Sequence, residues 1–418
     1  MTKNSKLIDK LLLFSYTFLM ISFFMPIKVN SIAFIVCGVF SILKLKKLPY
    51  EKLIQFPILL FPILFLYLLL GMTYTENLKA GWAIIERHYS LLFVPFIASS
   101  YSLFNKKQQK FILNVFVFTL IAAAVYCLVY AIVDYFISGS IYIKGKSGHH
   151  LYNKFMHHRL TEPLDMHAVY FSLYLSFSFL ILLNRFLKSH RAYSHLKKAS
   201  FYLLFVFFAL IIILLKSSLF ALALPLAILI LLIIHFKSMI FSSSKNLITT
   251  IVIFVLASTF SFYGIQSKLL NFSTDLKLEE QHPGPLKIRL GTWYCSWETV
   301  KDHWLMGAGT GDGQDELIKK YHELNFFIGK KDQFNAHNMY LQYWLSNGII
   351  AVLIYLLILF SFGLYFIKNK QFVAFLMVFL FAAFSFTEAT MLRQSGLAFF
   401  VLFCSIFYFY HETSKSTT

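Results

Sequence analysis

Apolar runs of about 20 residues recur along the chain, and they limit its fold more than any other feature. Each run is long enough to cross the ~30 Å hydrocarbon core of a bilayer as a helix. Composition agrees, because a chain that is 58% hydrophobic has too little polar surface for a soluble domain of 418 residues. We therefore predict an all-α, polytopic membrane protein of about 12 transmembrane helices, over residues 8–25, 29–43, 54–72, 81–99, 111–137, 164–185, 200–215, 218–236, 247–265, 343–367, 371–387 and 394–411.

The basic residues indicate how these spans are oriented. The net charge is +19, yet residues 266–338 carry 9 Lys/Arg and 10 Asp/Glu. Most of the excess lies in short loops that alternate with loops poor in Lys/Arg, which is the positive-inside pattern. The charge thus predicts orientation rather than a nucleic-acid partner. With 12 spans, both termini are expected in the cytoplasm.

Polar material is concentrated in one late segment. We divide the chain into helices 1–9 (residues 1–265), an outward loop (266–342) and helices 10–12 (343–418). A second outward loop covers 138–163 and carries two His pairs, which suit a solvated loop or a glycan-facing patch. No internal repeat is visible, and this disfavours a lipid-linked glycan transporter, since many transporters have two related halves.

The outward loop carries the residues most suited to chemistry. The stretch PLKIRLGTWYCSWETVKDHWLMG predicts a helix, and its spacing of Trp293, Trp297 and Trp304 suits a membrane interface. The following GAGTGDG contains Gly309 and Gly311 and allows close backbone approach to a ligand, although the pattern favours a plain tight turn. A second helix should run to about Leu324, capped by Asp312 or Asp315. No Gly-Lys-Ser/Thr follows, so this is no nucleotide P-loop.

The stretch NAHNMYLQYWLSNG, residues 335–348, lies where the chain re-enters the membrane. A neutral imidazole at His337 can accept a proton from a hydroxyl near pH 7. Asn335 and Asn338 can orient that ring or hold a sugar. A purely structural role for His337 at a helix start is equally compatible with the spacing.

Other polar residues in or near the spans were weighed in the same way. Arg87 lies in the fourth predicted span, where a charge is a functional candidate by default. His167 opens the sixth span and can line a cavity. Glu388 and Arg393 flank the last outward turn and suit a structural pair. The four cysteines lack metal or redox spacing, so we expect no disulfide, no metal and no cofactor.

Taken together, RLGTWYCSWETVKDHWLMGAGTGD and NAHNMYLQYWLSNGIIAVLIYLLIL resemble the O-antigen ligase and O-antigen polymerase superfamily of bacterial membrane glycosyltransferases. The shared pattern is an Arg, a Trp, a Gly-x-Gly-x-Gly turn, and a His-Asn-x-Tyr-Leu helix start followed by a Gly. Here it falls on Arg289, Trp293 or Trp297, Gly307, Gly309, Gly311, His337, Asn338, Tyr340, Leu341 and Gly348. The motifs cover residues 289–367.

The resemblance implies a reaction. Such enzymes move a whole glycan from an undecaprenyl diphosphate carrier to an acceptor hydroxyl on the outer face of the bacterial inner membrane. The acceptor is lipid A–core sugar in ligases and a second carrier-bound glycan in polymerases. It further implies that His337 activates the acceptor and that Arg289 binds the diphosphate. No Asp-x-Asp pair is present in the outward loops, so a metal-independent, inverting displacement is coherent.

One motif departs from the family. Its members often have Ser-Arg-Gly at the outer start of a middle helix, where this chain has LLKSSLFALALP. Ser218 occupies the Arg position and Lys216 lies two residues before it. Lys216 can supply a point charge but not the planar fork of an arginine. Ligase and polymerase remain alternatives on these motifs, with ligase as the first hypothesis.

Overall fold

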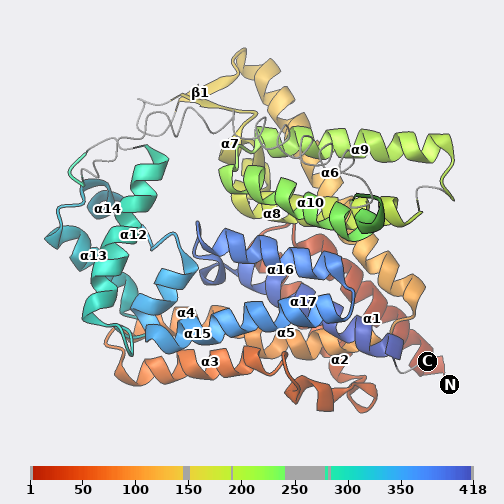
Figure 1. Ribbon diagram of the computed structural model, residues 1–418, viewed down its shortest axis with the longest axis horizontal. Helices are drawn as coiled ribbons and strands as arrows, with labels where there is room; N and C mark the ends of the chain where they lie inside the picture. The colour runs from red at the N-terminus through yellow and green to blue at the C-terminus, as the bar shows by residue number, and fades with distance from the viewer. Residues whose placement is uncertain (1–2, 145–150, 190–191, 241–277, 281–283, 416–418) are drawn as a thin grey trace. The chain divides into compact units, whose positions relative to one another are not determined.

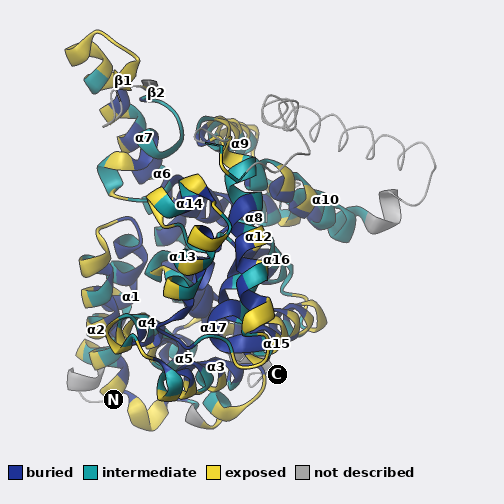
Figure 2. Ribbon diagram, turned by 90° about the vertical axis from the view of Figure 1, so that its left-hand side faces the viewer, coloured by how far each residue is buried: buried dark blue, intermediate teal, exposed yellow. Residues whose placement is uncertain are grey.

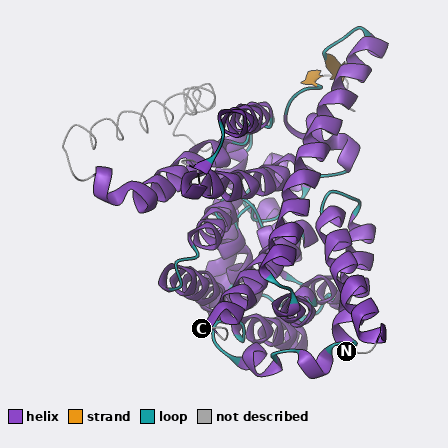
Figure 3. Cartoon of the chain, turned by 90° about the vertical axis from the view of Figure 1, so that its right-hand side faces the viewer, coloured by secondary structure: helices purple, strands orange, loops and turns teal. Residues whose placement is uncertain are grey.

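The computed structural model describes residues 3–144, 151–189, 192–240, 278–280 and 284–415. These residues are helical almost throughout, with one short β-hairpin (Figure 3), which confirms the predicted all-α class. The chain forms two compact units: unit 1 comprises Met1–Lys46 and Leu103–Gly264, and unit 2 comprises Lys47–Ser102 and Ile265–Thr418. This grouping differs from the three consecutive segments of the sequence analysis, because residues 47–102 join the late helices.

Five of the described helices are long and apolar enough to cross a membrane. They are α6 (Lys106–Ser138), α8 (Ala168–Ser189), α9 (His195–Leu214), α10 (Ser218–Ile240) and α15 (Met339–Lys368). Shorter apolar helices are α2 (Ile27–Ile42), α3 (Leu60–Leu70), α16 (Phe372–Ser385) and α17 (Gln394–Lys415). The chain is therefore a multi-pass membrane protein, and the predicted number of 12 spans is not confirmed.

Two of the predicted spans show why the structure does not confirm the number of 12 transmembrane helices. The span at residues 247–265 lies outside the described residues. The span at 81–99 is formed by two helices, α4 (Leu78–His88) and α5 (Ser90–Ser99), which meet at Tyr89. Glu86 and Arg87 are exposed on α4, so this helix has a polar face as well as an apolar one.

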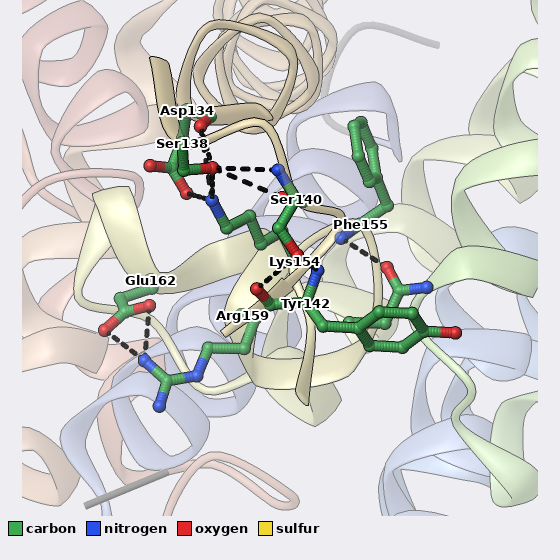
Figure 4. Close-up of polar contacts among 9 residues, drawn as sticks. Asp134, Ser138, Ser140, Tyr142, Lys154, Phe155, Arg159 and Glu162 are labelled. Atoms are coloured by element: carbon green, nitrogen blue, oxygen red, sulfur yellow. Dashed lines mark hydrogen bonds and ion pairs between the residues drawn. The ribbon is translucent and has the colours of Figure 1, made fainter. Parts of the chain in front are cut away.

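Unit 1 contains α1 (Lys3–Ser22), α2, α6, the antiparallel strands β1 (Tyr142–Lys144) and β2 (Leu151–Asn153), α7 (His157–Thr161) and α8 to α10. Figure 2 shows that α8 is buried along most of its length. Lys154, which is buried, fastens the hairpin to the end of α6: its Nζ lies 2.6 Å from Oδ2 of Asp134 and also donates to Ser138 (Figure 4). Part of the outward loop 138–163 thus has a defined structure.

Unit 2 contains α3, α4, α5, α12 (Pro285–Asp302), α13 (Gly313–Glu323), α14 (Phe327–Asp332) and α15 to α17. Helices α12, α13 and α14 gather at one end of α15 (Figure 1). The buried side chains that join them come from α12, α13, α15 and the connecting loops: Cys295, Val300, Leu317, Tyr321, Phe326, Ala336 and Leu345. Most of the predicted outward loop is therefore a small helical layer packed on the start of α15.

A break in α15 receives the glycine turn. Gly348 has φ 74° and ψ −177°, which interrupts the helix and releases carbonyl groups before it. The N–H groups of Ala308 and Gly309 donate to the carbonyls of Leu345 and Ser346, each over 2.9 Å. A Cβ at Gly348 would lie 2.0 Å from the carbonyl oxygen of Leu305, so only glycine fits there. This close approach of two backbones fixes the outer layer to α15.

Helix α12 packs against the rest of unit 2 through one side. Its buried side is made of mostly small residues: Gly291, Thr292, Cys295, Ser296, Thr299 and Val300. Trp297 is exposed, and Trp304 lies beyond the end of the helix. Small side chains let α12 approach its neighbours closely, and the hydroxyls of Thr292, Ser296 and Thr299 bond to carbonyls of their own helix. The tryptophans are not among the buried residues of α12, and their predicted place at a membrane interface stays a prediction.

Candidate active site

The loop that carries His337 is held from several sides within unit 2. Gln314 Nε2 donates to the carbonyls of Gln333 and Phe334, over 3.1 and 3.0 Å. Tyr321 donates to the carbonyl of Phe334 over 3.0 Å, and Trp293 Nε1 donates to the carbonyl of His337 over 3.2 Å. Helices α12 and α13 therefore fix the loop backbone directly before α15 begins.

His337 itself has φ 44°, in the left-handed region that few non-glycine residues adopt. Such a conformation costs free energy and persists where surrounding bonds impose it, which is common at functional sites. The side chain is 24% exposed, and its ring lies 5.4 Å from the ring of Phe334, centroid to centroid. The imidazole is thus set in place by its loop while part of it remains open to solvent.

Glu388 lies against this ring. Its Oε1 is 3.4 Å from Nδ1 of His337, and its side chain is 6% exposed. Nδ1 is buried and makes no hydrogen bond within the described part of the chain, so the carboxylate is its nearest ionic neighbour. Glu388 comes from the turn between α16 and α17, 51 residues further along the chain. A histidine whose one nitrogen faces a carboxylate has the arrangement of a general base.

The side chains of Asn335 and Asn338 form hydrogen bonds with backbone N–H groups. Oδ1 of Asn335 accepts from the N–H of His337 over 2.9 Å, which supports the unusual conformation of that residue. Oδ1 of Asn338 accepts from the N–H of Leu341 over 3.1 Å and caps the start of α15. Neither bond involves the imidazole. The predicted contact of either amide with a sugar stays a prediction.

Arg289 lies one helical turn before Trp293 on α12, so both side chains share the face that reaches His337. The Arg289 side chain is half-buried. Its guanidinium makes no hydrogen bond or ion pair with any residue that the structure describes. Its planar group with five N–H donors thus lies on the face of α12 that bonds to the His337 backbone.

Arg87 approaches the site from α4. Its Nη1 lies 3.4 Å from the carbonyl oxygen of Leu392, in the turn that also bears Glu388. The sequence analysis paired Glu388 with Arg393, and this is wrong: Glu388 is directed to His337, and the exposed Arg393 has no ion pair to a described residue. The turn lies between the apolar helices α16 and α17. Their sequences did not indicate which residue the carboxylate of Glu388 would contact.

The glycine turn is packed against protein. A Cβ at Gly311 would lie 2.3 Å from the carbonyl oxygen of Asn77, and one at Gly309 would lie 2.6 Å from Oδ2 of Asp312. Asp312 does not cap α13 as predicted, because its carboxylate accepts from the N–H groups of Glu76 and Asn77 at the start of α4. The tight-turn interpretation thus explains these glycines without a ligand, and their predicted part in binding substrate rests on the resemblance alone.

Two predicted site residues belong to unit 1. Lys216 is exposed in the break between α9 and α10, with φ 48°. His167 precedes α8, and its ring centroid lies 3.8 Å from that of His158. The site geometry within unit 2 involves neither residue, so their predicted roles stay predictions.

Glu388 is the residue that sequence reasoning missed. An acidic residue at the end of an apolar run was visible in FSFTEATMLRQ, and a carboxylate at a membrane boundary is costly unless it has a partner. That cost was a usable indication of function. The sequence did not identify the partner, because two helices, α15 and α16, separate Glu388 from His337 along the chain.

Part of the chain matches a known protein family. No curated protein matches the sequence. Residues 203–356 match the family model described as O-antigen ligase, and this region includes both Arg289 and His337. Over this region, which carries the motif residues at the start of α15, the chain is similar to the O-antigen ligase family.

Proposed function

We propose that this protein transfers a glycan en bloc from undecaprenyl diphosphate to a hydroxyl of lipid A–core, on the periplasmic face of the bacterial inner membrane. One observation carries the proposal: the part-exposed imidazole of His337, held by its loop with Nδ1 against the buried carboxylate of Glu388. This is the arrangement that removal of a hydroxyl proton requires.

The reaction needs one base and a stabilised leaving group. Nε2 of His337 takes the proton from the acceptor hydroxyl as that oxygen bonds to the anomeric carbon of the carrier-linked sugar. The bond from that carbon to the diphosphate oxygen breaks, and the diphosphate departs with the electron pair. Attack from the face opposite the diphosphate inverts the anomeric centre. The imidazolium then returns its proton to solvent or to the released diphosphate.

Arg289 is the residue that we propose binds the diphosphate. Its guanidinium is uncommitted among the described residues and shares a helix face with Trp293, which bonds to His337. Charge grows on the diphosphate as the glycosidic bond breaks, and fixed cations beside it stabilise the transition state. Arg87 adds a second guanidinium from α4. We retain Lys216 as a further cation and His167 as a cavity residue, both as predictions that the resemblance motivates.

The direction of α15 supports a periplasmic site. His337 precedes the first residue of this helix, and Lys368 and Lys370 follow at its far end. Residues 349–368 alone, about 20 residues, cover ~30 Å at 1.5 Å per residue and so can cross the hydrocarbon core. With the lysines in the cytoplasm, as positive-inside loops require, the imidazole lies at the outer surface. Together with the predicted 12 spans, this direction leads us to propose that both termini are cytoplasmic.

Transfer by the purified protein tests this proposal. The protein in liposomes would receive undecaprenyl diphosphate-linked glycan with either lipid A–core or a second carrier-linked glycan, in the presence of a chelator. We expect a lipid A–core product with inverted anomeric configuration, seen by mass spectrometry and NMR. Product from the second carrier alone would identify a polymerase of the same superfamily. Transfer to neither acceptor, a metal requirement or retained configuration would contradict the proposed reaction.

A further inference from the structure

We propose that Glu388 is the positioning residue for His337, holding the imidazole in the tautomer that leaves Nε2 free to accept the acceptor's proton. This inference rests on the proposed function. The observation behind it is independent of the family motifs, because Glu388 lies outside both motif stretches and outside the matched residues 203–356. It also differs from the sequence expectation, in which Glu388 was half of a structural pair.

The contact is directed at one nitrogen. Nδ1 of His337 is sealed from solvent, and Oε1 of Glu388 lies 3.4 Å away. A buried nitrogen beside a carboxylate is best occupied by N–H, which then donates toward the oxygen. The lone pair must in that case reside on Nε2. The separation is longer than a normal hydrogen bond, and catalytic bonds in substrate-free structures are often long and shorten in the complex.

The turn that carries Glu388 is anchored to α15. The hydroxyls of Tyr355, Ser385 and Thr390 form a buried chain with separations of 2.7 and 2.8 Å. The N–H of Met391 donates to Sδ of Met339, two residues after His337, over 3.2 Å. Glu388 and His337 are therefore fixed to the same helix from two directions. A carboxylate held in this way stabilises the imidazolium at the moment of proton transfer without reorganising.

Three of the charged residues that the structure describes contact the ring, contact the Glu388 turn or lie on the face of α12 that bonds to the His337 loop. Glu388 contacts the ring from the α16–α17 turn, and Arg289 lies on the face of α12 that reaches the His337 carbonyl. Arg87 approaches the same turn from α4, at Leu392. Removal of the Glu388 charge leaves only cations in this set, and cations disfavour a protonated ring. Two effects follow: less stabilisation of the imidazolium, and a base that stays neutral to lower pH.

Steady-state transfer by Glu388→Gln and Glu388→Asp tests the inference. A carboxylate that orients a metal-bound histidine is worth about 10- to 100-fold. We expect a loss of kcat of about that size in Glu388→Gln, with little change in KM for the donor. The acid limb of its pH–rate profile should move to lower pH. Glu388→Asp keeps the charge and should recover part of the activity. Glu323→Gln, an exposed residue on α13, is the matched control.

A double variant separates this inference from the proposed function. If Glu388 acts through His337, Glu388→Gln should cost nothing further in a His337→Gln background. Unchanged kcat and pH profile in Glu388→Gln, while His337→Gln is inactive, would overturn the inference alone. Full activity of His337→Gln would overturn the proposed function. A structural role for Glu388 would give a different result. Glu388→Gln would then lower the thermal stability, its loss of activity would add to that of His337→Gln, and its pH profile would match that of wild type.

Discussion

At the scale of single residues, the proposed transfer reaction depends on a few polar side chains that can still bind a substrate. The clearest is Arg289, which has no partner among the described residues yet shares a helix face with Trp293. Arg289→Ala should lower transfer about 10²- to 10³-fold, as expected when one donor to a developing negative charge is removed. Arg289→Lys should recover only part, because an ammonium lacks the planar fork. Transfer kinetics of purified variants would measure both.

Lys301→Ala is the control for this prediction. Lys301 is an exposed cation on the same helix, and it pairs with Glu298 within that helix. Equal losses in Lys301→Ala and Arg289→Ala would mean that the net charge of α12, rather than a diphosphate contact, accounts for the effect.

The site residues show what sequence reasoning could reach. His337 and Arg289 were predicted because their motif spacing is local and imidazole and guanidinium chemistry follow from residue type. The backbone roles of Asn335 and Asn338 were not predicted, since a cap and a sugar contact need the same residue types. Glu388 was assigned to the wrong partner, because Arg393 is close in sequence while His337 is close only after α15 and α16 have packed.

At the scale of elements, the break in α15 determines where the outer layer attaches. Gly348→Ala should destabilise the protein by at least about 1–3 kcal/mol, since φ 74° with ψ −177° is a region that only glycine adopts readily. The added methyl group would also meet the backbone of Leu305. Gly363→Ala on the same helix is the control, because its Cβ would lie 3.9 Å from the nearest atom. Thermal unfolding in detergent would compare them, and equal midpoints would contradict the assigned break.

The contact between α12 and α13 should depend on pH. Lys320 donates to Asp302 over 2.8 Å, which lowers the pKa of Asp302 and raises that of Lys320. A lowered carboxyl pKa stabilises the fold above the ordinary value of 3.8 and stops doing so as pH falls through the folded value. Lys320→Met should therefore cost at most about 1 kcal/mol at pH 7, because the carboxylate of Asp302 is 56% exposed, and less at pH 3. Lys320 also pairs with the exposed Glu323, so the measured loss includes both pairs.

Fluorescence-detected unfolding of wild type and Lys320→Met at the two pH values would measure this difference. Lys331→Met, which removes an exposed lysine from α14, is the control. It measures how far the loss of any one positive charge changes the stability. A destabilisation by Lys320→Met that is as large at pH 3 as at pH 7 would contradict the assigned pairing.

At the scale of the whole molecule, the sequence predicted the class of fold better than its organisation. Long apolar runs dictate membrane helices, and the structure confirms that class. The two compact units could not be predicted, because α3, α4 and α5 join α12 to α17 through contacts such as Tyr67 with Asn347, 280 residues away. The buried side of α12 was also missed, since small polar residues resemble solvent-facing ones until close packing is seen.

Orientation in the membrane is a prediction at this scale. Reporter fusions at Lys46 and Lys368 should give cytoplasmic signals, and a fusion at Gln314 should give a periplasmic one, because the lysine-rich loops are retained inside. Activity assays of paired periplasmic and cytoplasmic reporters would measure this. A cytoplasmic signal at Gln314 would place α13 and the His337 loop on the wrong side for acceptor chemistry.

The most direct test of the central claim is single-turnover transfer by His337→Gln. The substitution keeps a polar side chain of similar reach but removes the proton acceptor, and general-base catalysis contributes about 10²- to 10⁴-fold. His322→Gln, an exposed histidine on α13, is the matched control. We expect His337→Gln to bind the carrier-linked glycan as wild type does and to lose transfer by that factor, while His322→Gln transfers normally. Wild-type transfer by His337→Gln would show that His337 is structural and would contradict the proposed mechanism.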